Sequence, residues 1–310
     1  MLYFIVNEKS KSGNAKQIWK EIEEVLKVRN VSYQAFVSEY RGHAGKLATE
    51  ICAMDDNDIC LVAVGGDGTA NEVINGITDF EKVRFGVIPT GSGNDLARGL
   101  SLSKDPKNGV IHILNAMKKT HEDTWCMDLG EVNFGEKKRL FAISAGIGLD
   151  ALVCKKALKS TIKDILNKIR LGKLTYLVLT VQSLFTMQTA DAELFFDREE
   201  GLQKKRMIFM AAMNFKAEGG GVPMAPAASA CDGKLSFCEA AGIPKWRTFL
   251  CLPFLVAAKH TSVHGFSVTD AKDCTIRLSR PMVVHADGEY CGEVTEVHFH
   301  CLPGKLRVLK

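Results

Sequence analysis

The 310 residues are enough for two domains, and 46% hydrophobic with 25% charged residues are ordinary values for a globular protein with a buried core. This composition excludes a disordered chain, and a net charge of +4 is too small for the whole surface to indicate nucleic-acid binding. No apolar stretch approaches the ~20 residues that span a bilayer, so any membrane contact is expected to be peripheral.

The ten cysteines are scattered and none forms a CxxC pair. Buried free thiols in a reducing cytoplasm explain this pattern best, with a zinc site or a disulfide framework as the alternatives. Residues 2–6 follow Met1 without a basic segment, so they are expected to be a first β-strand rather than a signal peptide.

The first part of the chain repeats a strand, a polar or glycine-rich turn and a helix-period segment. The predicted strands span residues 2–6, 33–37, 59–64 and 85–88. Repeated units of this kind favour a mostly parallel sheet with helices on both faces. We therefore expect residues 1–125 to form an α/β nucleotide-binding domain.

The third unit joins an apolar run to the turn Gly65-Gly66-Asp67-Gly68-Thr69, and a helical pattern follows at once. Glycines let a ligand approach the backbone, and the first N–H groups of a helix have no partner within it. Such a turn is an anion site, although it can also be purely structural. The charge of Asp67 beside a phosphate suggests a nucleotide with Mg²⁺.

The fourth unit has a similar turn, with Gly91-Ser92-Gly93 after its strand. A dinucleotide fingerprint would need a third glycine at position 96, which is leucine, and a Walker lysine is also absent. Open α/β sheets bind ligands at the carboxyl ends of their strands. The third and fourth turns are therefore expected to meet at one crevice.

From about residue 124 the pattern changes to strands that follow one another, which predicts a second, mostly antiparallel domain over residues 126–310. Predicted strands include residues 141–144, 192–196, 207–213, 235–239 and 275–278. A last strand over residues 305–309 either closes this domain or returns to the first one, and both alternatives stay open.

A basic helical insertion is expected over residues 151–187. Residues 151–176 carry seven basic side chains against Asp164, beside an apolar helical stripe. An amphipathic basic helix suits an anionic membrane surface. The alternative is a helix packed on the core with a solvated cationic face.

A late acidic motif reads His285-Ala286-Asp287-Gly288-Glu289. An isolated Asp-Gly-Glu sequence is typical of a β-turn, and its alternative role is to supply a general base at a domain cleft. His285 is interpreted as structural because no second histidine stands at a suitable spacing.

The motifs GGDGTANE at 65–72, PTGSGNDLAR at 89–98 and HADGE at 285–289 together resemble the diacylglycerol kinase catalytic-domain family, especially its bacterial soluble lipid kinases, relatives of sphingosine and ceramide kinases. GGDGT alone is shared with NAD kinases and phosphofructokinases. The resemblance implies an NAD kinase-like or phosphofructokinase-like α/β domain, a C-terminal mostly antiparallel β-sandwich and an active site in the interdomain cleft.

The resemblance also implies the residues of the site. Those expected to bind ATP are Asn7, Ser10, Lys11, Ser38, Gly65, Gly66, Asp67, Gly68, Thr69, Asn71, Glu72, Ser92 and Asn94. Those expected to act in catalysis are Asp287 as the base, Glu289 beside it, and Asp67, Asp95 and Asp128 in a network of Mg²⁺ and water. Those expected to hold a second, structural Mg²⁺ are Ser229, Asp232 and Lys234.

The first loop departs from the family pattern, since Glu8 replaces a proline and Lys11 replaces a glycine. Lys11 binds phosphate directly in one interpretation, and in the other the loop is shifted. Serine replaces threonine at positions 38 and 92, which keeps the hydroxyl group.

These features predict an ATP-dependent kinase that phosphorylates a lipid hydroxyl, with diacylglycerol as the default acceptor and phosphatidic acid as the product. It is expected in the cytoplasm, peripheral to the inner face of the cell membrane, with residues 151–176 on anionic lipid and without nucleic acid. A homodimer is compatible with the sequence. The alternatives are a kinase for a soluble acceptor such as NAD, and a catalytically silent regulator that binds nucleotide or lipid.

Overall fold

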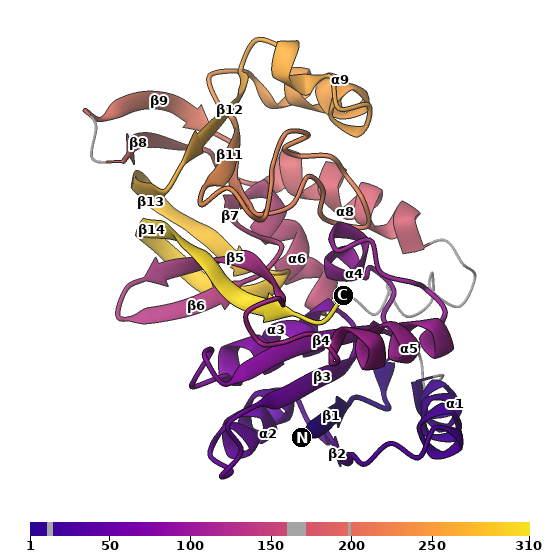
Figure 1. The fold of residues 1–310 in the computed structure, drawn as a ribbon. Helices are drawn as coiled ribbons and strands as arrows, with labels where there is room; N and C mark the ends of the chain where they lie inside the picture. Colours follow the sequence, from indigo (N-terminus) through magenta and orange to yellow (C-terminus); the bar gives the residue numbers. More distant parts are fainter. Residues whose placement is uncertain (11–14, 160–171, 198–199) are drawn as a thin grey trace. The chain divides into compact units, whose positions relative to one another are not determined.

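The computed structural model describes residues 1–10, 15–159, 172–197 and 200–310. The chain divides into two compact units (Figure 1). Unit 1 consists of Met1–Leu129 and Pro303–Lys310, and unit 2 of Gly130–Leu302. The expected division at residues 125/126 lies slightly before this one. Unit 1 therefore takes residues from both ends of the chain.

Four strand pairs of the unit 1 sheet are parallel. Its strands are β1 (Leu2–Val6), β2 (Gln34–Val37), β3 (Ile59–Gly65), β4 (Val83–Pro89) and the end of β14 (Glu289–Val308). They lie in the order β2-β1-β3-β4-β14. Arg307 pairs with Arg84 and Val308 with Phe85, so the last strand returns to the first domain. This decides the alternative that the sequence left open.

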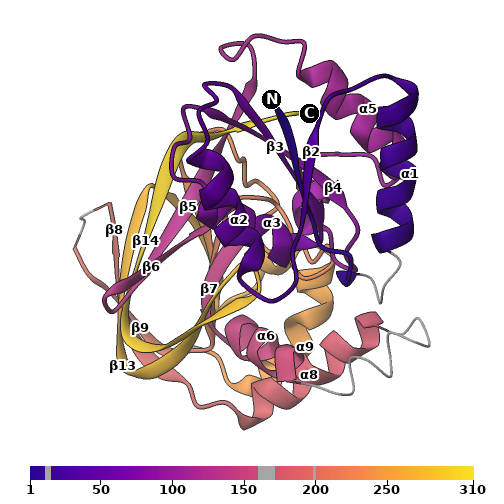
Figure 2. The ribbon, with the colours of Figure 1, turned by 90° about the horizontal axis from the view of Figure 1, so that it is seen from below.

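Helices cover both faces of this sheet, and Figure 2 shows α1 and α5 on one side and α2 and α3 on the other. The helices of unit 1 are α1 (Ala15–Val28), α2 (His43–Cys52), α3 (Asp67–Gly76), α4 (Asp95–Gly99) and α5 (Pro106–Ala116). Trp19, Ile22 and Leu26 of α1 lie one helical turn apart and pack on the same core as Phe4 and Val62 of the strands. β1, β3 and β4 are buried at every residue, so both faces of this part of the sheet are covered.

Unit 2 is built from antiparallel strands. They are the end of β5 (Trp125–Phe134), β6 (Lys137–Phe141), β7 (Ser144–Gly148), β8 (Ala190–Phe196), β9 (Leu202–Met207), β10 (Phe209–Met213), β11 (Leu235–Ala240), β12 (Phe266–Ala271), β13 (Asp273–Ala286) and most of β14. Six of them follow the order β12-β11-β10-β7-β13-β14, and β8 pairs with β13 and β9.

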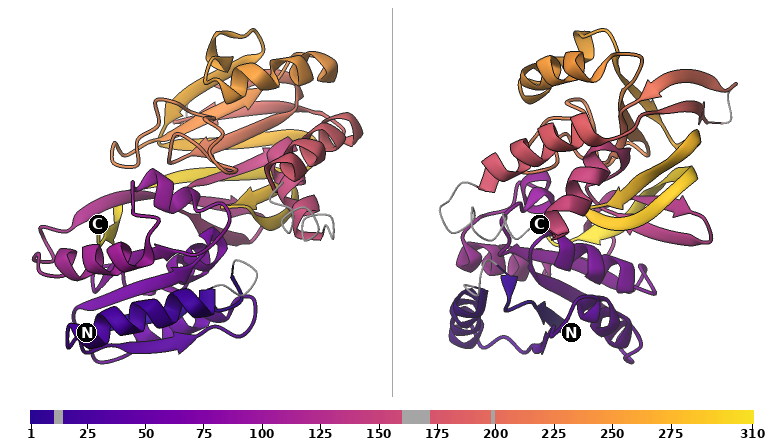
Figure 3. Two further views of the ribbon diagram at one scale, coloured as in Figure 1. Left: turned by 90° about the vertical axis from the view of Figure 1, so that its right-hand side faces the viewer. Right: turned by 180° about the vertical axis from the view of Figure 1, so that it is seen from behind.

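The helical parts of unit 2 are α6 (Leu149–Lys159), α8 (Gly172–Thr186), α9 (Lys245–Val256) and the short η2 (His260–Ser262). α8 and α9 are neighbours, as Figure 3 shows, and the rings of Phe185 and Phe249 lie 6.1 Å apart between them. Lys163, Lys168 and Arg170 of the predicted membrane segment lie outside the described residues. Lys155 and Lys156 of that segment lie in α6.

Two predicted strands of unit 2 are wrong in their bounds. The strand expected over 141–144 is the junction where β6 ends at Phe141 and β7 begins at Ser144. The strand expected over 207–213 divides at Ile208, whose N–H donates to Ala240 and whose carbonyl accepts from Leu149. An apolar run does not show which main-chain N–H and C=O groups pair with a neighbouring strand. The sequence therefore does not reveal where one strand ends and the next begins.

The ten cysteines are free thiols, as the sequence interpretation requires. Most are buried or half-buried, whereas Cys126 and Cys231 are exposed. No disulfide framework therefore supports the part of the chain that the structure describes.

Candidate functional site

Three turns of unit 1 meet at the carboxyl edge of its sheet. They follow β1, β3 and β4, which are parallel neighbours and therefore end at the same edge. The N–H of Asn7 donates to the Val64 carbonyl over 2.9 Å, and the N–H of Thr90 donates to the Gly65 carbonyl over 2.8 Å. Main-chain hydrogen bonds thus join each turn to the next.

The two glycine turns touch backbone to backbone. A Cβ atom on Gly91 would lie 2.6 Å from the Cα of Gly66, and a Cβ on Gly66 would lie 3.2 Å from the Cα of Gly91. Any side chain at either position would push the turns apart. α3 starts directly after Gly66, so its N-terminal N–H groups lie beside this contact and favour an anion.

Gly91→Ala is expected to lower the free energy of unfolding by about 1–3 kcal/mol, because the added methyl group overpacks a contact between two backbones. Gly109→Ala is the matched control. It lies inside α5, where the nearest atoms to an added Cβ are 3.9 Å away, so alanine should stabilise the helix by about 0.5–1 kcal/mol. Urea unfolding of both variants measures the difference. Equal effects at the two positions would contradict the close contact.

Hydroxyl and amide groups line the same edge. Asn7 Nδ2 donates to Thr69 Oγ1 over 3.0 Å, and Ser10 Oγ lies 2.5 Å from Thr90 Oγ1. Ser38 is buried, and its N–H donates to the Val6 carbonyl over 2.9 Å. Thr90 was not among the predicted site residues, although its place directly after the β4 residue Pro89 was the available signal. Four of the predicted polar residues are therefore gathered here.

The carboxylates of Asp67 and Asp95 converge beside Gly93. A Cβ atom on Gly93 would lie 3.0 Å from Asp67 Oδ2 and 3.5 Å from Asp95 Oδ2, so the glycine leaves room between them. Asp67 Oδ1 accepts a hydrogen bond from Leu96 N over 3.0 Å, and Asp95 forms an ion pair with Arg98. Paired carboxylate oxygens next to an anion site are the ligand chemistry of Mg²⁺.

Several residues that were predicted to bind the nucleotide form hydrogen bonds to protein groups instead. The Asn94 amide exchanges hydrogen bonds of 2.9 and 3.0 Å with the Gly91 main chain and closes the turn in the left-handed region. Asn71 is buried, and its carbonyl groups accept from Asn75. Glu72 Oε1 accepts from Gly42 N over 2.8 Å. These contacts shape the turns that surround the anion site.

The other residues of unit 1 that were predicted to bind ATP, or to join the network of Mg²⁺ and water, lie in different places. Ser92 is exposed in its turn, and Lys11 lies outside the described residues. Asp128 is buried in β5, and its Oδ1 accepts from Gly304 N over 2.7 Å. That bond ties the returning end of β14 to β5.

Asp287 and Gly288 form the two-residue loop between β13 and β14. The flanking pairs are Ala286 with Glu289 and His285 with Tyr290, and φ is +48° at Asp287 and +80° at Gly288. Positive φ at both loop residues is the requirement of a type I′ hairpin, for which Asp-Gly is a preferred sequence. The β-turn interpretation is thus correct for the backbone.

The Asp287 side chain points into unit 2 and is only 9% exposed. Its Oδ2 accepts from Ala142 N over 2.8 Å, and its Oδ1 accepts from Ile143 N over 2.8 Å and from Ser144 N over 3.1 Å. These three amides lie where β6 passes into β7, which explains why no strand spans residues 141–144. Charge-assisted bonds to main-chain donors hold the carboxylate in one orientation.

His285 supports this hairpin. Its Nδ1 accepts from Gly288 N over 3.2 Å, and its Nε2 lies 3.1 Å from Asp150 Oδ2. Burial lowers the pKa of His285, but the hydrogen bond and charge of Asp150, with the charges of Glu218 and Asp287, raise it above the usual value. In the neutral ring Nδ1 is the acceptor and Nε2 donates to Asp150. The structural interpretation of His285 therefore fits its contacts.

Asp150 and Glu218 are polar residues of this region that were not singled out as site residues. Glu218 bonds the Ser144 hydroxyl, and one ligand atom from each of Asp150, Glu218 and His285 lies within 4.8 Å of the others. The signal in the sequence was the aspartate that follows the glycine-rich segment of β7. Glu289 is half-buried at the start of β14.

Residues 229, 232 and 234 lie on an exposed turn. Asp232 Oδ1 accepts from Lys234 N over 3.1 Å, which is the hydrogen bond of an Asx turn. A structural Mg²⁺ at this turn stays a prediction.

Two family models match the chain. The model described as the diacylglycerol kinase catalytic domain matches residues 1–126. The model described as the YegS C-terminal NAD kinase beta sandwich-like domain matches residues 144–310. The second match alone spans more than half of the chain, and the two together leave out only a short connecting segment.

Similar curated proteins cover most of the chain. A Bacillus subtilis protein described as "Putative lipid kinase YtlR" is 29% identical over 99% of this chain and 98% of its own length. A diacylglycerol kinase of Bacillus subtilis is 27% identical over 81% of this chain and 76% of its own.

Similar solved structures support the fold. A structure from Bacillus anthracis, described as a "putative diacylglycerol kinase", has a TM-score of 0.77 at 21% identity and covers 99% of this chain and 96% of its own. An Archaeoglobus fulgidus NAD kinase in complex with ATP has a TM-score of 0.54 at 13% identity and covers 100% and 94%. The α/β domain followed by a β-sandwich domain, expected from the sequence, is confirmed.

Proposed function

Because the chain belongs to the diacylglycerol kinase catalytic-domain family, we propose that it is a lipid kinase that transfers the γ-phosphoryl group of ATP to the hydroxyl of a diacylglycerol. The observation that carries this proposal is the backbone contact of Gly66 with Gly91 beside the carboxylates of Asp67 and Asp95. A contact without side chains next to a helix N-terminus suits a polyphosphate, and the carboxylates suit its Mg²⁺.

The turns of unit 1 would hold the nucleotide. Main-chain N–H groups at the start of α3 would face phosphate oxygens, and the Asn7 and Ser10 side chains would line the same edge. Asp67 and Asp95 would hold Mg²⁺, which would neutralise charge on the transferred phosphoryl group. The hydroxyls of Ser10 and Thr90 would stay hydrogen-bonded to each other or turn to the phosphates.

Asp287 would accept the proton of the lipid hydroxyl. The hydroxyl oxygen would then form its bond to the γ-phosphorus as the bond to the ADP oxygen breaks, giving phosphatidic acid and ADP. Three main-chain donors fix the direction of the carboxylate, and His285 with Asp150 supports the turn that carries it. Positioning a base in this way is a large part of what an enzyme can contribute to phosphoryl transfer.

The test is transfer of the labelled γ-phosphoryl group from ATP to vesicles that contain diacylglycerol, with NAD as a parallel acceptor. Labelled phosphatidic acid is the expected product. Label in NADP would replace the lipid proposal with a kinase for a soluble acceptor, and no product with either acceptor would favour a silent regulator.

A second proposal concerns how the protein would contact the membrane that contains its lipid substrate. The α9 patch consists of the exposed side chains Trp246, Phe249, Leu250, Phe254 and Val256 on α9. The opposite side of the helix is buried through Thr248, Cys251 and Leu255. A helix that is apolar on both faces is normally enclosed by other apolar groups, so the exposed face favours a lipid surface.

The charge around α9 fits an anionic membrane. α9 contains no acidic residue, and Arg247 and Lys259 are exposed near its two ends. Lys155 of the predicted segment 151–176 is instead bound to Glu293 over 2.6 Å and lies over the Tyr290 ring. Among the described residues no helix is both long and apolar enough to span a membrane. We therefore propose peripheral contact through α9 in addition to residues 151–176, at the inner face of the cell membrane.

A further inference from the structure

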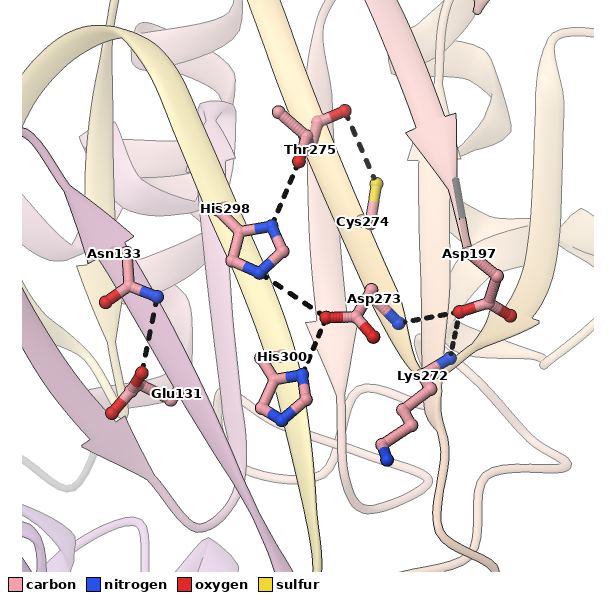
Figure 4. A network of polar contacts seen from close by, with 9 residues as sticks. All are labelled: Glu131, Asn133, Asp197, Lys272, Asp273, Cys274, Thr275, His298 and His300. Atoms are coloured by element: carbon pink, nitrogen blue, oxygen red, sulfur yellow. Dashed lines mark hydrogen bonds and ion pairs between the residues drawn. The ribbon is translucent and has the colours of Figure 1, made fainter. Parts of the chain in front are cut away.

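Two histidines and an aspartate face one another on β13 and β14 of unit 2 (Figure 4). Asp273 is paired directly with His300, and Thr275 is paired with His298. Residues two apart on a strand point to the same face of the sheet, so His298, His300 and Asp273 share one face. This cluster is separate in the sequence from the turns and from the Asp287 hairpin.

The three side chains aim at one point. Asp273 Oδ1 lies 2.6 Å from His300 Nδ1 and 3.4 Å from His298 Nε2, and one ligand atom of each residue lies within 4.8 Å of the others. The two imidazole rings are stacked, with an interplanar angle of 18°. Two ring nitrogens and a carboxylate oxygen therefore converge without any change of main-chain register.

We propose that Asp273, His298 and His300 form a binding site for a divalent transition-metal ion of the zinc type. Metal–ligand bonds of about 2.0–2.1 Å in a tetrahedron place neighbouring ligand atoms about 3.3 Å apart. The 3.4 Å separation of Asp273 Oδ1 and His298 Nε2 already has this length. The 2.6 Å separation from His300 Nδ1 is that of a direct hydrogen bond, and it must lengthen by about 0.7 Å when a metal takes the place of the proton.

Contacts behind the ligands orient them as metal sites require. His298 Nδ1 lies 2.9 Å from Thr275 Oγ1, so the threonine hydroxyl is placed to accept from Nδ1–H in the tautomer whose unprotonated Nε2 would bind the metal. Asp197 Oδ1 accepts from the N–H groups of Lys272 and Asp273 over 2.9 Å each. These bonds fix the start of β13, and with it the carboxylate of Asp273 (Figure 4).

The exposure of the site matches an ion taken from solution. The side chains of Asp273, His298 and His300 are 33%, 38% and 30% exposed, so an ion can enter and a water molecule can complete the tetrahedron. Imidazole nitrogens favour Zn²⁺ over Mg²⁺, which prefers oxygen ligands. This ion would therefore differ from the Mg²⁺ of the proposed kinase reaction.

The experiment is isothermal titration of the full chain with ZnCl₂. Because thiols also bind zinc, all proteins carry Cys126→Ser and Cys231→Ser, which remove the two exposed thiols. One Zn²⁺ per chain is expected to bind. His298→Asn and His300→Asn should each weaken this binding by at least about 10-fold, whereas a matched control with His112→Asn and His264→Asn, two exposed histidines elsewhere, should bind as the parent does.

Thr275→Val is the second variant, and it keeps the β-branched shape while removing the hydroxyl that orients His298. Its affinity for Zn²⁺ should fall about 10-fold to 100-fold with unchanged circular dichroism. Absence of binding by the parent, or equal affinity in the His298→Asn and His300→Asn proteins, would show that the cluster is only a hydrogen-bond network. The titration does not depend on kinase activity, so failure of either proposal is distinguishable from failure of the other.

Discussion

Asp287→Asn is expected to lower the rate of lipid phosphorylation about 10²-fold to 10⁴-fold, the usual contribution of a positioned general base. The amide has no basic oxygen of comparable strength to take the proton of the lipid hydroxyl. ATP binding should be retained, because the turns that would hold the nucleotide belong to unit 1. Rates with labelled ATP and diacylglycerol vesicles, together with nucleotide affinity measured by titration, separate the two effects.

The same substitution is expected to cost stability, and this needs a control. The new side-chain amide has a single acceptor oxygen for the three main-chain donors, so at least one of the three bonds would be lost at about 1–3 kcal/mol. Unfolding in urea shows whether the variant is folded under the assay conditions. Glu289→Gln leaves the three amide bonds in place and should change the rate by less than about 10-fold. A folded Asp287→Asn protein within about threefold of the parent rate would remove Asp287 as the base.

A triple variant of the α9 patch, Trp246→Ser with Leu250→Ser and Phe254→Ser, is expected to weaken binding to anionic vesicles about 100-fold. These side chains are 59%, 57% and 49% exposed. Their insertion into lipid would contribute about 1 kcal/mol each, roughly half the value for complete burial. Vesicle sedimentation measures the binding, and phosphorylation of a dispersed short-chain diacylglycerol should be unchanged.

The control for the α9 patch is Val28→Ser, which removes an 87% exposed apolar side chain at the end of α1 in unit 1. It should bind vesicles as the parent does. If the triple variant sediments with vesicles as well as this control, the patch does not contact lipid. Raising the salt concentration should weaken parent binding, because Arg247 and Lys259 would lie near anionic head groups.

The order of elements in unit 1 was predictable because β1, β3 and β4 contain apolar runs that end at a glycine or polar turn. The meeting of the turns at 65–68 and 91–93 followed from parallel pairing alone. The return of residues 305–309 to β4 was not predictable, because an alternating strand fits the edge of either sheet equally well. A helix from Leu96 onward was predicted for the fourth unit, and α4 begins there at Asp95 but ends at Gly99.

The residues of the candidate site could be predicted from the sequence, but the contacts that they make could not. Asp287-Gly288 indicated a hairpin, yet the amides that hold its carboxylate are as many as 145 positions away in the sequence. α9 was missed because its buried and exposed faces are both apolar, so its sequence has no amphipathic pattern. His298 and His300 stand two apart, and only the register of β13 and β14 brings Asp273 to them.

Residues 303–310 also have a consequence for biosynthesis. They complete the edge of the unit 1 sheet at β4, although the rest of that unit ends at Leu129. While the ribosome makes unit 2, the main-chain groups along β4 await a partner strand, and an open strand edge is a template for pairing with other chains. Synthesis of residues 303–310, rather than of residues 1–129, therefore sets the earliest time at which this domain can finish folding.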